Sequence, residues 1–251
     1  MKFDEIHKHV EGVPFITRKQ AKALYDFVLR EQPQECLELG FAHGTSVCYV
    51  AAALEEIGSG HITAVDLVSG KDWQDPSIEQ LLERCGLGHR VTVARERLSY
   101  TWFLKSKIEE CTANHRCSPV YDFCYIDGPK NWTIDGAAFF MVDKLLKENG
   151  FILFDDMSWT YGSSAEWSAK KLEECGILVS QMDEGEKNQP HVAAIFELLV
   201  IQHPNYSNFE IVDDDWGWAQ KIKSDDPKMK IRETSPFSTA FKRRVKKILG
   251  V

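Results

Sequence analysis

Apolar residues along the first 155 positions follow two alternating spacings, which indicates strands separated by helices. Short apolar runs of strand length occur at residues 35–39, 62–65, 91–94, 121–126 and 151–154. Between these runs apolar residues recur at helical spacing, as at Val47, Val50, Ala51 and Leu54. Strands that alternate with helices imply right-handed crossovers and a parallel sheet.

Local signals predict where several of the helices begin and end. Two pairs have the form of a capping box, and each predicts a helix start: Thr17 with Gln20, and Ser77 with Gln80. The first of these helices should stop near Pro33. Thr133 is expected to cap a later helix that Gly150 closes.

The pattern changes after Asp156, where the spacing favours a helix over 165–174 and then two strands at 177–181 and 192–200. A hairpin-sized loop separates these strands, so they should be antiparallel. From about His203 the periodicity is lost, until a last apolar stripe among basic residues.

The expected fold is therefore α/β and doubly wound. It has a mostly parallel seven-stranded sheet with an antiparallel last strand, and helices on both faces. The chain would divide into an N-terminal helical segment at 1–34, a main domain at 35–202 and a C-terminal extension at 203–251.

Composition and charge narrow the classes of function. Hydrophobic residues make up 43% and charged residues 27% of the chain, as in ordinary soluble globular proteins. The net charge of −8 argues against a nucleic-acid binder, which needs clustered Lys and Arg to neutralise phosphates. No transmembrane run of 18 apolar residues and no signal peptide are visible, so a cytoplasmic location is expected.

The cysteines and the basic C-terminus carry less information. The seven cysteines are odd in number and include no C-x-x-C pair, which favours reduced thiols over disulfides or a zinc site. Apolar residues at 241–249 form a stripe among five cations, Lys242, Arg243, Arg244, Lys246 and Lys247. The stripe fits a solvated helix or a weak contact with an anionic membrane surface. Homo-oligomerisation is left open.

A glycine-rich loop joins the first strand of the main domain to the helix that follows it. Glycine lets backbone N–H groups approach a ligand, and a helix N-terminus favours negative charge. A dinucleotide fingerprint would place glycines at positions 40, 42 and 45, but Ala42 and Thr45 stand at the last two. An NAD-dependent oxidoreductase is therefore disfavoured.

The loop resembles instead the first motif of class I S-adenosylmethionine-dependent methyltransferases, acidic-x-Gly-x-x-x-Gly. The resemblance implies that Glu38 contacts the amino group of the cofactor and that Asp66, at the end of the second strand, holds its ribose hydroxyls. The cofactor-binding residues that we expect are Glu38, Gly40, His43, Gly44, Ser46, Asp66, Glu96, Arg97 and Asp127.

Three carboxylates follow two neighbouring strands of the expected sheet. Asp127 follows the strand at 121–126, and Asp155 and Asp156 follow the strand at 151–154. The carboxyl ends of such strands face the ligand crevice of a doubly wound sheet. Three carboxylates that converge there repel one another unless a cation lies between them, and oxygen ligands favour a hard ion such as Mg²⁺. Alternatively, the acids are turn and helix-cap residues.

Order and spacing at these positions resemble the metal-dependent O-methyltransferases, among them catechol O-methyltransferase and enzymes that act on natural products and sugars. The resemblance implies a metal site at Asp127, Asp155 and Asp156, with Lys130 and Asp127 as catalytic residues. Lys130 would act as the base if burial and a neighbouring cation depress its pKa. The sequence departs from the catechol enzymes at Asp156, where they carry an amide, and this puts a catechol acceptor in doubt.

Trp132, Trp159 and Tyr161 flank the carboxylates and are expected either to wall the acceptor pocket or to pack in the core. The favoured function is Mg²⁺-assisted O-methylation of a small-molecule or sugar hydroxyl. Metal-independent O- or N-methylation is the alternative within the same class. An oxidoreductase and a non-catalytic scaffold are the alternatives outside it.

Overall fold

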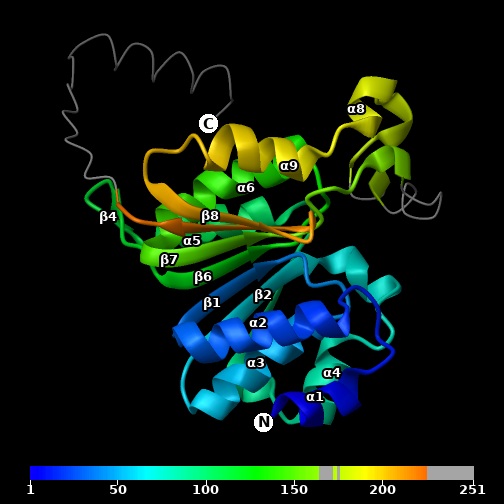
Figure 1. The fold of residues 1–251 in the computed structure, drawn as a ribbon, viewed down its shortest axis with the longest axis vertical. Helices are drawn as coiled ribbons and strands as arrows, with labels where there is room; N and C mark the ends of the chain where they lie inside the picture. The colour runs from blue at the N-terminus through cyan, green and yellow to red at the C-terminus, as the bar shows by residue number, and fades with distance from the viewer. Residues whose placement is uncertain (164–171, 174–175, 225–251) are drawn as a thin grey trace, which may run out of the picture.

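A seven-stranded sheet lies between two layers of helices in the computed structural model, which describes residues 1–163, 172–173 and 176–224 (Figure 1). The strand order is β3-β2-β1-β6-β7-β9-β8. Five strands run parallel: β1 (Glu35–Leu39), β2 (His61–Leu67), β3 (Val91–Glu96), β6 (Tyr121–Ile126) and β7 (Leu146–Phe154). Two further strands, β8 (Tyr206–Val212) and β9 (Trp216–Lys221), are antiparallel to each other, and β9 is antiparallel to β7. A separate small hairpin consists of β4 (Thr112–Ala113) and β5 (Arg116–Cys117).

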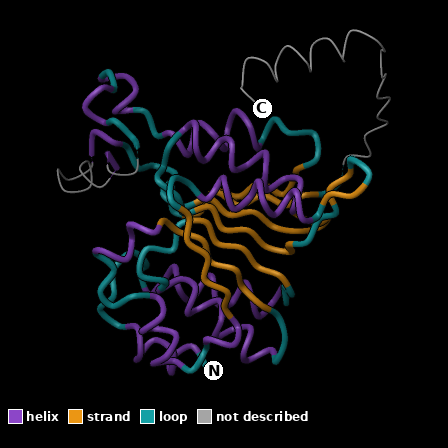
Figure 2. Tube along the Cα trace, turned by 180° about the vertical axis from the view of Figure 1, so that it is seen from behind, coloured by secondary structure: helices purple, strands orange, loops and turns teal. Residues whose placement is uncertain are grey.

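Helices cover both faces of the sheet, which Figure 2 shows from behind. One layer contains α1 (Phe3–Val10), α2 (Arg18–Glu31), α3 (Thr45–Ile57) and α4 (Ile78–Cys85). The other contains α5 (Tyr100–Glu110), α6 (Trp132–Leu145) and α9 (His191–Ile195), which continues into a π-helical turn, η5 (Phe196–Val200). Shorter helices are η1 (Val68–Asp72), η2 (Gly88–Arg90), η3 (Tyr161–Ser163), η4 (Val179–Gln181) and α8 (Glu184–Asn188).

Strand β1 lies between β2 and β6, and its side chains pack into the core on both faces of the sheet. Leu37 and Leu39 pack into the apolar cluster under α5 and α6, whereas Cys36 packs into the cluster under α2 and α3. Leu39 pairs with Val65 of β2 on one side and with Ile126 of β6 on the other. The carboxyl ends of these three strands therefore coincide where the strand order reverses, which is the usual ligand crevice of a doubly wound sheet.

The predicted fold class is confirmed, and so are both capping boxes, at Thr17 and at Ser77. Two boundaries were wrong. Asn131, not Thr133, caps α6, since its side chain accepts from the backbone N–H of Thr133 and Ile134. The same helix ends at Leu145, and Gly150 lies inside β7 rather than at the end of the helix.

The two strands predicted at 177–181 and 192–200 were wrong. Residues 179–181 form the single turn η4, and 191–200 are helical. The buried residues in the second segment have helical spacing and pack beside α6: Val192, Ile195, Phe196 and Val200. The antiparallel pair is formed instead by β8 and β9, within the predicted C-terminal extension. The predicted helix at 165–174 falls mostly outside the described residues, and the basic stripe at 241–249 entirely so.

No helix in the described ranges is long and apolar enough to cross a membrane.

Candidate active site

The glycine loop between β1 and α3 is pressed against its neighbours. Gly40 has a φ of +88° and Gly44 a φ of +86°, a left-handed conformation that L side chains rarely adopt. A Cβ at Gly40 would overlap the backbone oxygen of Asp127, and one at Gly44 would overlap the side chain of Ile78. Glycine at both positions therefore lets the loop approach the end of β6 and the start of α4.

Glu38 is a fully buried carboxylate directly before this loop. Its Oε1 accepts a hydrogen bond from Ser46 Oγ at 2.5 Å. Its Oε2 is buried and has no hydrogen-bond partner among the described residues. Burial raises the pKa of Glu38 to about 8, and the nearby Asp155 and Asp66 add to this, whereas Ser46 opposes it. An unsatisfied buried carboxylate oxygen fits a cationic partner, such as the ammonium group of S-adenosylmethionine.

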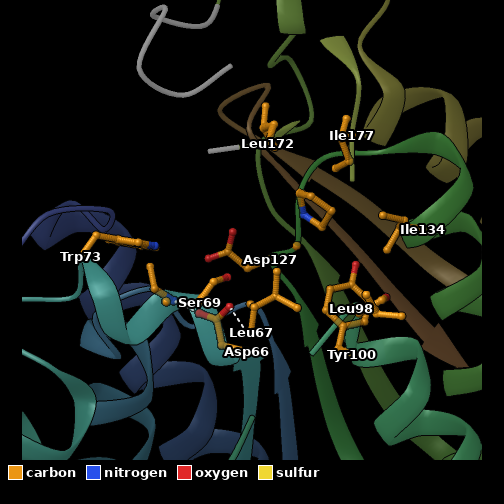
Figure 3. Close-up of a pocket in the computed structure, with 16 residues that line it drawn as sticks. Asp66, Leu67, Ser69, Trp73, Leu98, Tyr100, Asp127, Ile134, Leu172 and Ile177 are labelled. Atoms are coloured by element: carbon orange, nitrogen blue, oxygen red, sulfur yellow. Dashed lines mark hydrogen bonds between the residues drawn. The ribbon is translucent and has the colours of Figure 1, made fainter. Parts of the chain in front are cut away.

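Asp66 is the penultimate residue of β2 and contacts the loop through Ala42. Its Oδ2 accepts from Ala42 N at 2.8 Å, and its Oδ1 accepts from Leu67 N at 2.7 Å. Burial raises the pKa of Asp66, and these backbone N–H groups oppose the shift. Asp66 and Asp127 both lie at the wall of a cavity of about 210 Å³ (Figure 3). The cavity is also lined by Gly40, Ser69, Trp73, Leu98, Ser99 and Ile134.

Six of the nine residues predicted to bind the cofactor do not line this cavity: Glu38, Gly44 and Ser46, which are described above, and His43, Glu96 and Arg97. The Nδ1–H of buried His43 donates to the backbone oxygen of Pro76 at 2.8 Å, which fixes the ring between Phe15 and Trp73. Glu96 still belongs to β3, where it pairs with Leu67, and Arg97 is exposed.

The cavity is reached two residues later than predicted, at Leu98 and Ser99. Ser99 is also the N-cap of α5, since its Oγ accepts from Thr101 N at 3.1 Å. A serine before a helix is a common N-cap, so Ser99 could have marked the end of this loop in the sequence. The predicted Gly40 and Asp66 do line the cavity.

A second cavity of about 510 Å³ adjoins the first, and Gly40, Trp73, Asp127 and Gly128 line both. Further wall residues are the acids that follow β7, Lys130, Phe15 and Thr17 before α2, and Gln20 in the first turn of that helix. Asp127 lies at the junction, so ligands held in the two cavities would meet beside this carboxylate.

The three aromatic residues that were candidates for the second cavity differ in position. Trp159 lines it. Tyr161 is buried and packs on Trp159, and its hydroxyl donates to the backbone oxygen of Pro129 at 3.0 Å. Trp132 is 40% exposed at the start of α6 and is not part of the wall. Phe15 and Trp73 line the cavity but were not predicted, because they come from segments far away in the sequence.

The predicted acidic residues come together. Carboxylate oxygens of Asp127, Asp155 and Asp156 all lie within 4.8 Å of one another, a geometry that suits a hard divalent cation. Lys130 Nζ donates to Asp127, and it lies 3.0 Å from Asp156 Oδ2 and 3.9 Å from Asp155 Oδ2. Lys130 and Asp156 have φ values of +59° and +57°. This conformation is strained for both residues, and it brings their side chains to the cluster.

The charged groups of the cluster shift one another's pKa values. Burial raises the pKa of Asp127, and Asp155 adds to the increase. Burial favours the neutral form of Lys130, but the three carboxylates outweigh burial, so its pKa is raised well above the ordinary value. The condition stated for Lys130 as a base was burial together with a neighbouring cation, and its nearest neighbours in this structure are anions, which favour the ammonium form.

Two contacts that the sequence did not indicate hold this cluster in place. Trp216 of β9 donates its Nε1–H to Asp155 Oδ1 at 2.6 Å, in a buried position. Below the loop after β6, the buried Tyr100 hydroxyl donates to Asp135, which also accepts from Asn131 N at 2.6 Å. Burial raises the pKa of Asp135 to about 6. A side chain at Gly128 would overlap Tyr100 and Asp135, so this hydrogen-bonded pair packs directly against the loop after β6.

Comparison with known proteins gives a consistent result. Residues 37–157 match a family model described as a methyltransferase domain. The fold is similar to that of an O-methyltransferase from Bacillus cereus in complex with SAH, with 20% sequence identity, a TM-score of 0.56 and coverage of 87% of this chain and 90% of that chain. No protein with a curated description matches the sequence.

Two further solved structures have a similar fold. The O-methyltransferase TomG from Streptomyces achromogenes, in complex with SAM, has 15% identity and a TM-score of 0.59, with coverage of 88% of this chain and 89% of that chain. The SAH-bound methyltransferase PaMTH1 from Podospora anserina has 15% identity and a TM-score of 0.58, with coverage of 87% and 88%. The family match, the fold and the geometry of the glycine loop agree: residues 37–157 are a methyltransferase domain, and the chain has the fold of the SAM- and SAH-bound methyltransferases named above.

Proposed function

We propose that this methyltransferase acts on a hydroxyl oxygen of a small molecule or sugar, with Mg²⁺ held by Asp127, Asp155 and Asp156. The observation that carries the proposal is the position of Asp127. It lines both cavities and belongs to the carboxylate cluster. A hydroxyl held at the cluster would therefore lie beside the methyl donor.

The cofactor side of the reaction depends on three groups of the chain. S-adenosylmethionine supplies the methyl group on a sulfonium. Glu38 Oε2, which is buried without a partner among the described residues, would accept from the cofactor's ammonium group. Asp66, in the wall of the first cavity, would accept from the ribose, and the loop at Gly40 would lie against the part of the cofactor between its amino group and its ribose. Holding donor and acceptor near attack distance contributes much of the acceleration in such displacements.

On the acceptor side, a hydroxyl is a poor nucleophile until its proton is removed. A bound divalent cation would lower the pKa of the acceptor hydroxyl and fix the position of its oxygen. Lys130 Nζ is the proposed recipient of the proton. In the present geometry the carboxylates hold the ammonium form of Lys130, so neutralisation of these carboxylates by the cation is a condition for this role.

Two further observations support an oxygen acceptor. The similar structures from Bacillus cereus and Streptomyces achromogenes are O-methyltransferases. In addition, Phe15, Trp73 and Trp159 line the second cavity, and aromatic side chains suit the planar faces of phenols and of sugars.

Calorimetry with S-adenosylmethionine, with and without Mg²⁺, followed by a screen of phenolic, sugar and amine acceptors, tests the proposal. We expect cofactor binding in both conditions and methyl transfer to a hydroxyl that increases with Mg²⁺. Asp155→Ala should abolish the Mg²⁺ dependence and leave cofactor affinity unchanged. Wild-type activity in that variant would refute the metal site, and transfer restricted to amines would refute O-methylation.

One observation favours a second candidate, metal-independent O- or N-methylation. Lys130 Nζ already places a positive charge among the three carboxylates, so the cluster is partly compensated by the chain itself. Full activity in an excess of chelator would select this candidate over the first.

A further inference from the structure

Asp66 is held by a buried chain of polar side chains that has no part in the chemistry described above. Gln74 is 4% exposed, and its Nε2 donates to Asp66 Oδ2 at 3.2 Å. Arg95 NH1 donates to Gln74 Oε1 at 2.8 Å, and the Arg95 side chain is 8% exposed. This series of hydrogen bonds thus connects Arg95 of β3 through Gln74 to Asp66 of β2.

The direction of the Gln74 amide follows from this chain. Arginine is a donor and never an acceptor, so the amide oxygen of Gln74 must face Arg95. The Nε2 group is then left to face Asp66, whose carboxylate only accepts when it is ionised. Swapping the amide would place two donors against each other on one side and two acceptors on the other.

The surroundings keep the two side chains in these positions. The guanidinium of Arg95 lies over the ring of Phe41, 5.0 Å from its centroid, and Phe41 belongs to the glycine loop. Arg95 NH2 also reaches Glu79 of α4 at 3.3 Å. A side chain at Gly70 would overlap Gln74 Nε2, so glycine there lets η1 close over the amide. Packing and hydrogen bonds together fix the rotamer of each group.

The two carboxylate oxygens of Asp66 therefore have different hydrogen-bond partners. Oδ2 accepts from both Ala42 N and Gln74 Nε2, which uses its two lone pairs. Oδ1 accepts from Leu67 N and has remaining capacity. Asp66 also lines the first cavity.

We propose that Gln74, held by Arg95, is a positioning residue that directs Asp66 Oδ1 to a ribose hydroxyl of the cofactor. This rests on the proposed role of Asp66 in binding S-adenosylmethionine. It refines the sequence-based expectation that the carboxylate holds both ribose hydroxyls, since one oxygen is already committed to the protein.

Binding of SAH and of its 2′-deoxy and 3′-deoxy analogues, measured by calorimetry, tests the proposal with Gln74→Met. Loss of a hydrogen bond to a charged group should weaken SAH binding by about tenfold. The wild-type protein should bind at least one deoxy analogue more weakly than SAH, and that difference should shrink to less than about threefold in the variant, because the two changes remove one shared interaction.

A matched control is Gln34→Met, at an exposed position before β1 and at the opposite end of the strands, which should leave all three affinities unchanged. Arg95→Lys is the second variant. It keeps the charge but not the planar fork that holds Gln74, and it should give the same pattern. Thermal melting of each variant reports whether it is folded.

An equal loss of affinity for SAH and for both analogues would overturn the proposal, since a purely structural residue has that effect. Absence of SAH binding to the wild-type protein would instead refute the proposed function. The two failures are therefore distinguishable.

Discussion

Lys130 Nζ lies 3.0 Å from Asp156 Oδ2, at the point where the carboxylates after β6 and β7 meet. Both residues adopt a left-handed backbone conformation, which for non-glycine residues costs about 1–3 kcal/mol each. Strain of this kind persists when the surrounding structure requires it, and it is common at functional sites. The lysine thus acts as an internal counter-ion for the cluster.

An internal counter-ion should compete with a divalent cation for the same carboxylates. Replacing Lys130 by Met removes a like charge next to the ion, and we expect Mg²⁺ or Mn²⁺ to bind about tenfold more tightly or better. Isothermal titration in the absence of cofactor measures the effect. Lys19→Met is the matched control, because Lys19 pairs with Asp213 at an exposed position. Weaker metal binding to Lys130→Met than to the control would contradict the counter-ion role.

The strand-end carboxylates were predictable because their positions follow from a general rule. Parallel strands in a doubly wound sheet end at one edge, so Glu38, Asp66, Asp127 and Asp155 had to come together once the strands were identified. The capping boxes were predictable for a similar reason, since they depend on residues three positions apart.

The rest of the site depends on contacts between distant segments. Trp216 reaches Asp155 from β9, a strand that the sequence pattern did not reveal, and Phe15 approaches His43 from the loop before α2. Sequence spacing does not predict the direction of a loop side chain. His43 was expected to contact the cofactor, but its ring donates to Pro76 and does not line the first cavity. The apolar run at 192–200 was ambiguous, because both a buried strand and a buried helix are apolar.

Cofactor affinity should depend on pH through Glu38. Its pKa is raised to about 8 by burial, so the free protein mostly carries a neutral Glu38 at pH 7. An ammonium partner favours the ionised carboxylate, and binding below pH 8 should therefore release a proton. Affinity should rise with pH, by up to about tenfold per unit between pH 6 and 8, and then level off.

Calorimetry in buffers of different ionisation enthalpy measures the proton released by Glu38 directly. Glu38→Gln should bind more weakly and lose this proton release, and it gives the baseline for titration of the cofactor's own amino group. An identical pH profile in the wild type and in Glu38→Gln would mean that Glu38 does not contact the ammonium.

Trp216 should raise the metal affinity of the proposed site by orienting Asp155, although it is not itself a ligand. Its Nε1–H holds Asp155 Oδ1, which leaves Oδ2 toward the cluster. Substitutions of residues that orient a metal ligand commonly reduce metal affinity by about 10–100-fold. Trp216→Phe keeps most of the packing and should show a loss in this range, measured by Mn²⁺ titration, with cofactor affinity unchanged. Trp218→Phe on the same strand is the control, and equal effects of the two substitutions would argue against an orienting role.

The glycine loop offers a comparison in which backbone strain and steric overlap can be separated. Gly40 and Gly58 have nearly the same φ, +88° and +87°. A side chain at Gly58 would meet nothing within 4 Å, whereas one at Gly40 would overlap the backbone oxygen of Asp127. Gly58→Ala should therefore cost the strain alone, about 1–2 kcal/mol of unfolding free energy. Gly40→Ala should cost more and should also abolish S-adenosylmethionine binding, because the loop must move away from the end of β6. Denaturant unfolding and calorimetry on both variants measure the two effects, and intact cofactor binding in Gly40→Ala would show that the close approach of loop and strand is not required.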